Sequence, residues 1–255
     1  MRVPGRWVLL GLAAVSVMPV VALAYGFPGT LACAAIDVLP FRQLGGGMYV
    51  PEGGQEDAAA LAALRAAARS RIETAFGAPR ANPAIVFIQE EARFSLGAMG
   101  DTASSYFTPA RSCIVVGAKG RSVDVLAHEL MHAELAERVG FFARMKRIPV
   151  WFDEGLAMQV DHRRVYSVDL DDATDTTVRE YVTYQQFFDH DDGQLVQNYR
   201  AAKAEVARWL RSVGNETLYA SLERIRSGET VGEVTEVRAA GVNRGVRDAA
   251  APDRF

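Results

Sequence analysis

The sequence predicts an α+β fold, with a small sheet in the first half and helices around and after it. Two short runs rich in β-branched residues, at 85–88 and 113–116, predict strands. Apolar residues at helical spacing predict helices at 55–76 and 122–139. Because 49% of the 255 residues are apolar and 23% are charged, the composition is that of a globular domain rather than a disordered or collagen-like chain.

The remaining elements follow from turn residues and apolar spacing. A strand is expected at 48–50 after three glycines, and another at 104–108. Gly77 and Gly140 would end the two helices named above. The uncharged run at 7–24 and the positions of these elements divide the chain into four predicted segments. They are a signal peptide or membrane anchor at 1–24, an irregular lead-in at 25–46, one domain at 47–230 and a loosely ordered tail at 231–255.

The first 24 residues are typical of an export segment. Arg2 and Arg6 precede an uncharged run that is long enough to enter a bilayer. The small-x-small pattern at 22–24 suits signal peptidase, so a cleaved signal peptide and a retained anchor at 7–27 both stay open. In either case we expect the rest of the chain to be extracytoplasmic, in the periplasm or secreted, with contact to a membrane only through this segment.

The charge argues against a nucleic-acid partner. The formal net charge is −3, and without the first 24 residues 26 basic residues face 31 acidic ones, which gives −5. Binding to a phosphate backbone needs a basic surface. We therefore expect no nucleic-acid partner.

The chain has two cysteines, Cys33 and Cys113, and both follow the export segment. In an oxidising compartment they can form one disulfide. A free buried pair and a lipid-modified Cys33 are the alternatives that remain open.

The helix predicted at 122–139 contains the pentapeptide His128-Glu129-Leu130-Met131-His132. Histidines four residues apart lie on one helical face, so both can bind one zinc ion. Glu129 is rotated from them by about 100°, which places its carboxylate beside the open metal position, where it can take a proton from bound water. The alternative is a helix whose two histidines are ordinary surface or core residues.

A second helix is predicted to begin at Pro149 and to carry Glu154 in the segment 149–157, PVWFDEGLA. Twenty-one residues separate Glu154 from His132, enough for a loop and a returning helix, so Glu154 is the candidate third ligand. His162 and His190 lie in polar, Asp-rich stretches and are expected to be surface residues.

Over residues 121–161 the chain resembles the gluzincin zinc metallopeptidases, most closely the small bacterial peptidase-MA-like domains. The resemblance implies that one Zn²⁺ per chain is bound by His128, His132 and Glu154, with Glu129 as the general base. It also implies a zincin-like fold, in which a twisted sheet packs on the active-site helix and a mainly helical half follows. A substrate peptide would pair with the edge strand of that sheet, for which 113–117 is the candidate.

The resemblance also implies a tyrosine that donates to the oxyanion, and we assign Tyr199, which opens a helix predicted to reach Gly214 before a shorter helix at 216–225. A packing role for Tyr199 stays open, as do Tyr184 and Tyr181 as donors.

One position departs from the pattern of thermolysin-like members. Met158 stands where these carry an acid that orients the first histidine. The acids that orient the two histidines are thus unassigned, and Asp153, Glu134 and Asp161 are the candidates.

The function expected from the sequence is an exported zinc-dependent peptidase that hydrolyses peptide or protein substrates with zinc-activated water. A catalytically inactive, zinc-stabilised peptide-binding domain is the first alternative, and a metal-free cell-envelope interaction protein is the second. Retention of Glu129 favours the enzyme, because a structural zinc site does not need a carboxylate there.

Overall fold

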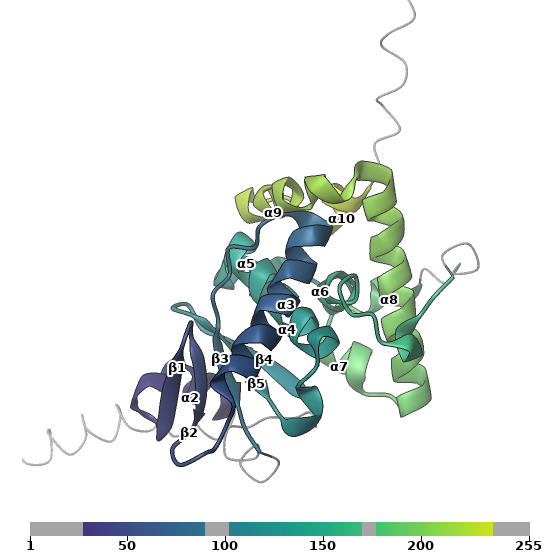
Figure 1. Ribbon diagram of the computed structural model, residues 1–255. Coiled ribbons are helices and arrows are strands. Elements are labelled where there is room, and N and C mark those ends of the chain that lie inside the picture. Colours follow the sequence, from purple (N-terminus) through teal and green to yellow (C-terminus); the bar gives the residue numbers. More distant parts are fainter. Residues whose placement is uncertain (1–27, 90–101, 170–176, 237–255) are drawn as a thin grey trace, which may run out of the picture.

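The computed structural model describes residues 28–89, 102–169 and 177–236, which form a mixed α+β arrangement (Figure 1). The predicted export segment at 1–24 and most of the predicted tail lie outside these ranges. Within them, no helix combines the length and the apolar character needed to cross a membrane.

Five strands form one sheet in the order β1-β2-β3-β5-β4. The inner pairs, β2 (Met48–Pro51) with β3 (Ala84–Phe87) and β3 with β5 (Ser112–Val116), are parallel. At the two edges β1 (Phe41–Gly45) and β4 (Ala103–Phe107) are antiparallel to their neighbours.

The expectation that 113–117 forms the edge strand is wrong, because β5 lies between β3 and β4. The physical reason is burial. Four of the five residues of β5 are buried, as suits a strand covered on both faces, whereas every residue of β4 is partly exposed. The apolar run at 113–116 therefore predicts an interior strand, and β4 is the edge.

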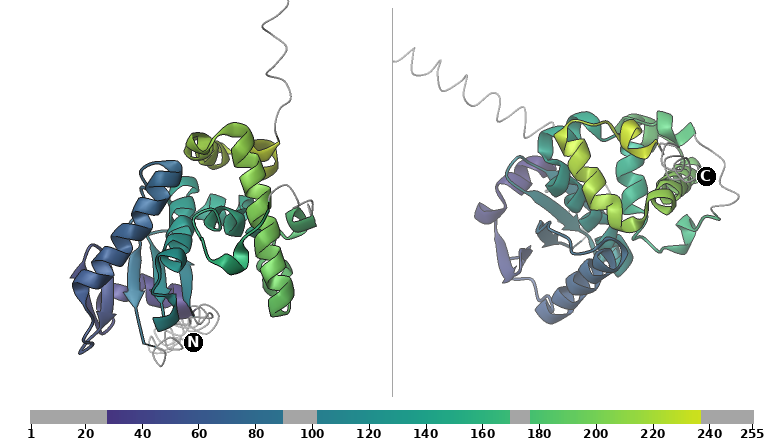
Figure 2. Two further views of the ribbon diagram at one scale, coloured as in Figure 1. Left: turned by 45° about the vertical axis from the view of Figure 1, so that its right-hand side comes forward. Right: turned by 90° about the horizontal axis from the view of Figure 1, so that it is seen from above.

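Helices cover both faces of the sheet (Figure 2). On one face α3 (Ala58–Phe76) and α4 (Val123–Val139) pack against alternate strand residues such as Ile85 and Phe87. On the other face α2 (Pro28–Ala34) packs against the intervening residues, such as Val86. The alternation follows from the two-residue period of a strand.

The expected irregular lead-in at 25–46 is therefore wrong for its described part, which holds α2, the 3₁₀ turn Ile36–Val38 and β1. Cys33 in α2 and Cys113 in β5 are joined by a disulfide, with a Cα–Cα distance of 5.7 Å. This bond ties α2 to the sheet, and packing rather than sequence pattern orders this segment.

The second half is helical, as expected, with α5 (Phe141–Arg147), α6 (Val150–Ala157), α7 (Tyr184–Phe188), α8 (Asp192–Val213), α9 (Leu218–Ser227) and α10 (Val231–Thr235). Helix α8 begins at Asp192 and not at Tyr199, because Asp191 caps it by accepting from the Gln194 amide. Part of the expected loose tail is ordered as α10, which buries Val231 and Val234.

The motif helix α4 has the predicted bounds. Ser122 caps its first turn by accepting from the Val125 amide, and Gly140 ends it with a φ of 83°, a conformation that glycine adopts without strain. Helix α6 then packs closely on α8: a Cβ at Gly155 would lie 2.5 Å from the Ala202 carbonyl oxygen. This close approach fixes where α6 places the residues on its opposite side.

Candidate metal centre

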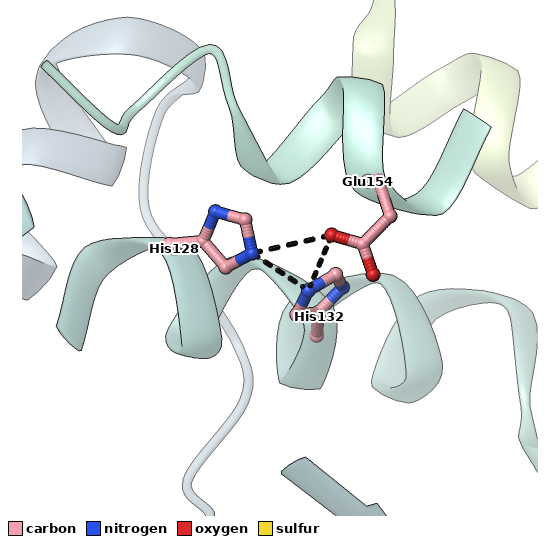
Figure 3. Close-up of side chains that lie close together, drawn as sticks. All are labelled: His128, His132 and Glu154. Carbon is pink, nitrogen blue, oxygen red and sulfur yellow. Dashed lines mark hydrogen bonds and ion pairs between the residues drawn. The ribbon is translucent and has the colours of Figure 1, made fainter. Parts of the chain in front are cut away.

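The two histidines of the motif lie on the buried face of α4, one turn apart. His128 and His132 are each 6% exposed, and their Nε2 atoms are 3.1 Å apart. Helical spacing brings the two side chains to the same face, and burial of α4 between the sheet and α6 turns that face inward. Both imidazoles therefore present a ring nitrogen to one point (Figure 3).

Helix α6 brings Glu154 to the same point from the other side (Figure 3). Its Oε2 atom lies 3.3 Å from His128 Nε2 and 3.6 Å from His132 Nε2. The expectation that the three residues converge is thus confirmed: their ligand atoms form a group that could hold a metal ion.

The spacing of the three atoms suits a small tetrahedral ion. Bonds of about 2.0–2.1 Å place tetrahedral ligand atoms about 3.3 Å apart. The observed separations of 3.1, 3.3 and 3.6 Å bracket this value. Glu154 Oε2 is buried and makes no hydrogen bond within the described residues, and a cation at this point would satisfy it. The residues therefore fit a metal ion.

The field at this point also favours a cation. Burial alone would raise the pKa of Glu154, but the charge of His132 and the close approach of both imidazole Nε2 atoms hold it well below its usual value. Burial alone would lower the pKa of His132, but the charges of Asp153 and Glu154 raise it well above the ordinary value. The carboxylates thus outweigh the cost of burying positive charge here.

Asp153 orients the second histidine. Its Oδ1 lies 2.6 Å from His132 Nδ1, which leaves Nε2 directed at Glu154, and its Oδ2 accepts from the Arg144 guanidinium on α5. A carboxylate that binds the far nitrogen of a ligand histidine fixes the ring and strengthens its basicity. Asp153, one of three candidates from the sequence, fills this role for His132.

Asp161 faces the first histidine. Its Oδ2 lies 3.5 Å from His128 Nδ1, longer than an ordinary hydrogen bond, and its carboxylate is held by Arg163. Glu134, the third candidate, is away from the cluster: it accepts from the Ala81 amide and from Arg138, so its role is structural.

Glu129 is 8% exposed and lies beside His128 on α4. The Ser105 hydroxyl of edge strand β4 donates to its Oε2 at 2.5 Å. The motif residue predicted as the base is thus connected to the sheet edge. Sequence reasoning missed Ser105 because the pairing of β4 with β5, which sets the face of each β4 side chain, is a tertiary feature.

Tyr199 lies beside the cluster, with its ring centroid 6.3 Å from that of His128. Burial, and then the charge of Glu154, raise the pKa of Tyr199 well above its usual value, so its hydroxyl stays protonated. Tyr166, which the sequence reasoning did not consider, packs against Tyr199 at 5.1 Å. Tyr184 stacks on Phe188 at 4.2 Å and is 56% exposed.

Three other expected residues lie elsewhere. Tyr181 packs on Phe187 and His190, and its carbonyl accepts from the Trp151 amide, so it serves the α6–α7 packing. His162 and His190 are surface residues, as expected, and neither joins the cluster. Arg144, like Ser105, gave no sequence signal, since its contact with Asp153 depends on how helix α5 is placed between α4 and α6.

Comparison with protein-family models, with curated proteins and with solved structures found no match. The chemical character of the site therefore rests on its own geometry: two imidazole nitrogens and one carboxylate oxygen that converge at one buried point.

Proposed function

We propose that this protein is an exported zinc-dependent peptidase of the gluzincin type, with a zincin-like fold. The observation that carries the proposal is the convergence of His128 and His132 on α4 with Glu154 on α6, together with Glu129 next to His128 on α4. A set of two histidines and one glutamate is typical of catalytic zinc, because three protein ligands leave one tetrahedral position for water or substrate. Structural zinc sites have four protein ligands.

The residues of the chain then take distinct roles. A bound zinc ion would act as a Lewis acid on the scissile carbonyl and would supply a water nucleophile near neutral pH. Glu129 accepts the proton of the attacking water and passes it to the leaving amine. Tyr199, kept protonated by its raised pKa, donates to the oxyanion as charge develops there. Asp153 holds the His132 ring in place throughout.

Export is part of the proposal and has two independent supports. The uncharged run that follows Arg2 and Arg6 is typical of a secretory or anchoring segment. The disulfide between Cys33 and Cys113 is typical of proteins that fold in an oxidising compartment. A peptide or protein substrate, and no nucleic acid, is the partner that we expect.

The first experiment measures the zinc content per chain of the purified protein and of its His132→Ala variant. We expect one zinc in the parent and a clear loss in the variant. No zinc after reconstitution would refute the proposal and leave a metal-free interaction protein as the better account.

The second experiment separates an enzyme from an inactive zinc-stabilised binding domain. Glu129→Gln keeps the size of the side chain and removes the base, so we expect hydrolysis of an unstructured protein such as casein to be lost while zinc content is unchanged. Hydrolysis by this variant at the parental rate would refute the assignment of Glu129. A zinc-loaded parent without hydrolysis would favour the binding domain.

A further inference from the structure

The hydroxyl of Ser105 is placed to control the carboxylate of Glu129. Strand β4 is the sheet edge that runs along α4, and its side chains alternate between the two faces. Ser105 pairs with Ile114 of β5, which packs in the core beside α4, whereas Ser104 pairs with Val115, which packs on the opposite face with α2. The side chain of Ser105 therefore faces α4, where it donates to Glu129 Oε2.

The contact matters because the Glu129 side chain has three rotatable bonds. Helix α4 fixes its Cα, but the direction of the carboxylate depends on what binds its oxygens. The Ser105 hydroxyl occupies one oxygen at 2.5 Å and leaves the other for a proton. A strand in a sheet is a rigid support, so the donor itself is fixed by the pairing of β4 with β5.

We propose that Ser105 is a positioning residue for the general base: its hydroxyl holds the Glu129 carboxylate in the orientation that accepts a proton. The inference rests on the proposed function of Glu129. It adds a residue outside the H-E-x-x-H helix, on the edge strand, to the machinery of the site. Loss of the hydroxyl leaves Glu129 present but free to rotate, and a misplacement of about 1 Å can cost on the order of 100-fold in rate.

The kinetic test compares Ser105→Ala, Ser105→Thr and Ser104→Ala in the zinc-loaded full chain. Ser104 is the matched control, since it is the same residue on the same strand but on the opposite face. We expect Ser105→Ala to lower kcat about 10- to 100-fold with KM and zinc content unchanged. Ser105→Thr keeps an Oγ donor and should recover most of kcat, and Ser104→Ala should match the parent.

A second measurement is independent of activity and of metal. In the zinc-free protein, urea unfolding of Ser105→Ala, Glu129→Ala and the double variant gives a double-mutant cycle. We expect the shift in midpoint caused by Ser105→Ala to become smaller once Glu129 is absent. Additive shifts would show that the two side chains do not interact, and would overturn the inference.

The outcomes also separate this inference from the proposed function. A kcat of Ser105→Ala within about twofold of the parent, or a loss that only follows lost zinc or lost folded protein, would overturn the role of Ser105 alone. An equal loss of kcat in Ser105→Thr and Ser105→Ala would also overturn the role of Ser105. A zinc-loaded parent with no hydrolysis would overturn the proposed function, and the role of Ser105 with it.

Discussion

Removal of the disulfide between Cys33 and Cys113 should destabilise the protein strongly. The bond closes a long loop, because the two residues are 80 positions apart in the sequence. Both side chains are buried, at 3% and 1% exposure, between α2 and the face of the sheet that α2 covers. The bond therefore restricts the unfolded chain over most of the segment that builds the sheet.

The size of the effect follows from the entropy of loop closure. For a loop of about 80 residues the chain-entropy relation gives about 4.5 kcal/mol at 25 °C, and removal of native disulfides typically costs about 2–5 kcal/mol. We expect the free energy of unfolding to fall by an amount in this range. Native proteins have only about 5–15 kcal/mol in total, so the reduced protein should be marginally stable.

The assay is urea unfolding of the oxidised protein, the reduced protein and the double variant Cys33→Ala/Cys113→Ala. Reductant should lower the midpoint of the parent and leave the double variant unchanged, which controls for other effects of the reductant. Equal midpoints for the parent with and without reductant would refute the pairing. A loss well below about 2 kcal/mol would refute the entropy argument while leaving the bond in place.

Three further predictions concern the packing of α6 on α8, the candidate metal group and an ion pair near the start of α4. Gly155→Ala should lower the free energy of unfolding, measured in urea, by about 3 kcal/mol. The added Cβ would lie 2.5 Å from a backbone oxygen of α8, which cannot shift without moving the helix. A loss below about 1 kcal/mol would show that α6 and α8 separate easily. Asp153→Asn should weaken zinc binding about 10- to 100-fold, because it removes the charge that orients His132. Competition with a chelator measures the affinity, and parental affinity would contradict this role of Asp153. The hydrogen bond from Arg121 holds the pKa of Glu56 below its usual 4.5, so this pair stabilises the fold at neutral pH and its contribution is lost as the pH falls below about 4.5. The stability difference between the parent and Glu56→Gln should therefore shrink on acidification, and a difference independent of pH would contradict the assignment.

The features that the sequence predicted well have local causes. Helix α4 has the predicted bounds because Ser122 and Gly140 are strong capping residues that act on their own neighbours. The four-residue spacing of His128 and His132 puts them on one face of any helix. Glu154 was predicted to join the two histidines from its place in the next helix, and its distances to both confirm that the three side chains converge.

The features that were mistaken depend on distant parts of the chain. The run 113–116 was placed at the sheet edge, but strand order is set by which strands pair, and β4 takes the outer position. Residues 25–46 carry weak local patterns, so the order of α2 comes from its packing on the sheet and from its disulfide. The start of α8 is an exception with a local cause: the cap at Asp191, which accepts from the Gln194 amide, places it seven residues before the expected Tyr199.

The sequence by itself determined the residue types of the candidate metal group, the spacing of its two histidines on α4 and the helix that carries its glutamate, because helical periodicity and capping act over a few residues. The tertiary structure alone decided that Asp153 binds His132, that Arg144 supports it from α5, and that Ser105 reaches Glu129 from the sheet edge. These contacts join elements whose relative placement is set by burial of the core and by strand pairing. Core burial and strand pairing cannot be predicted from the local spacing of residues.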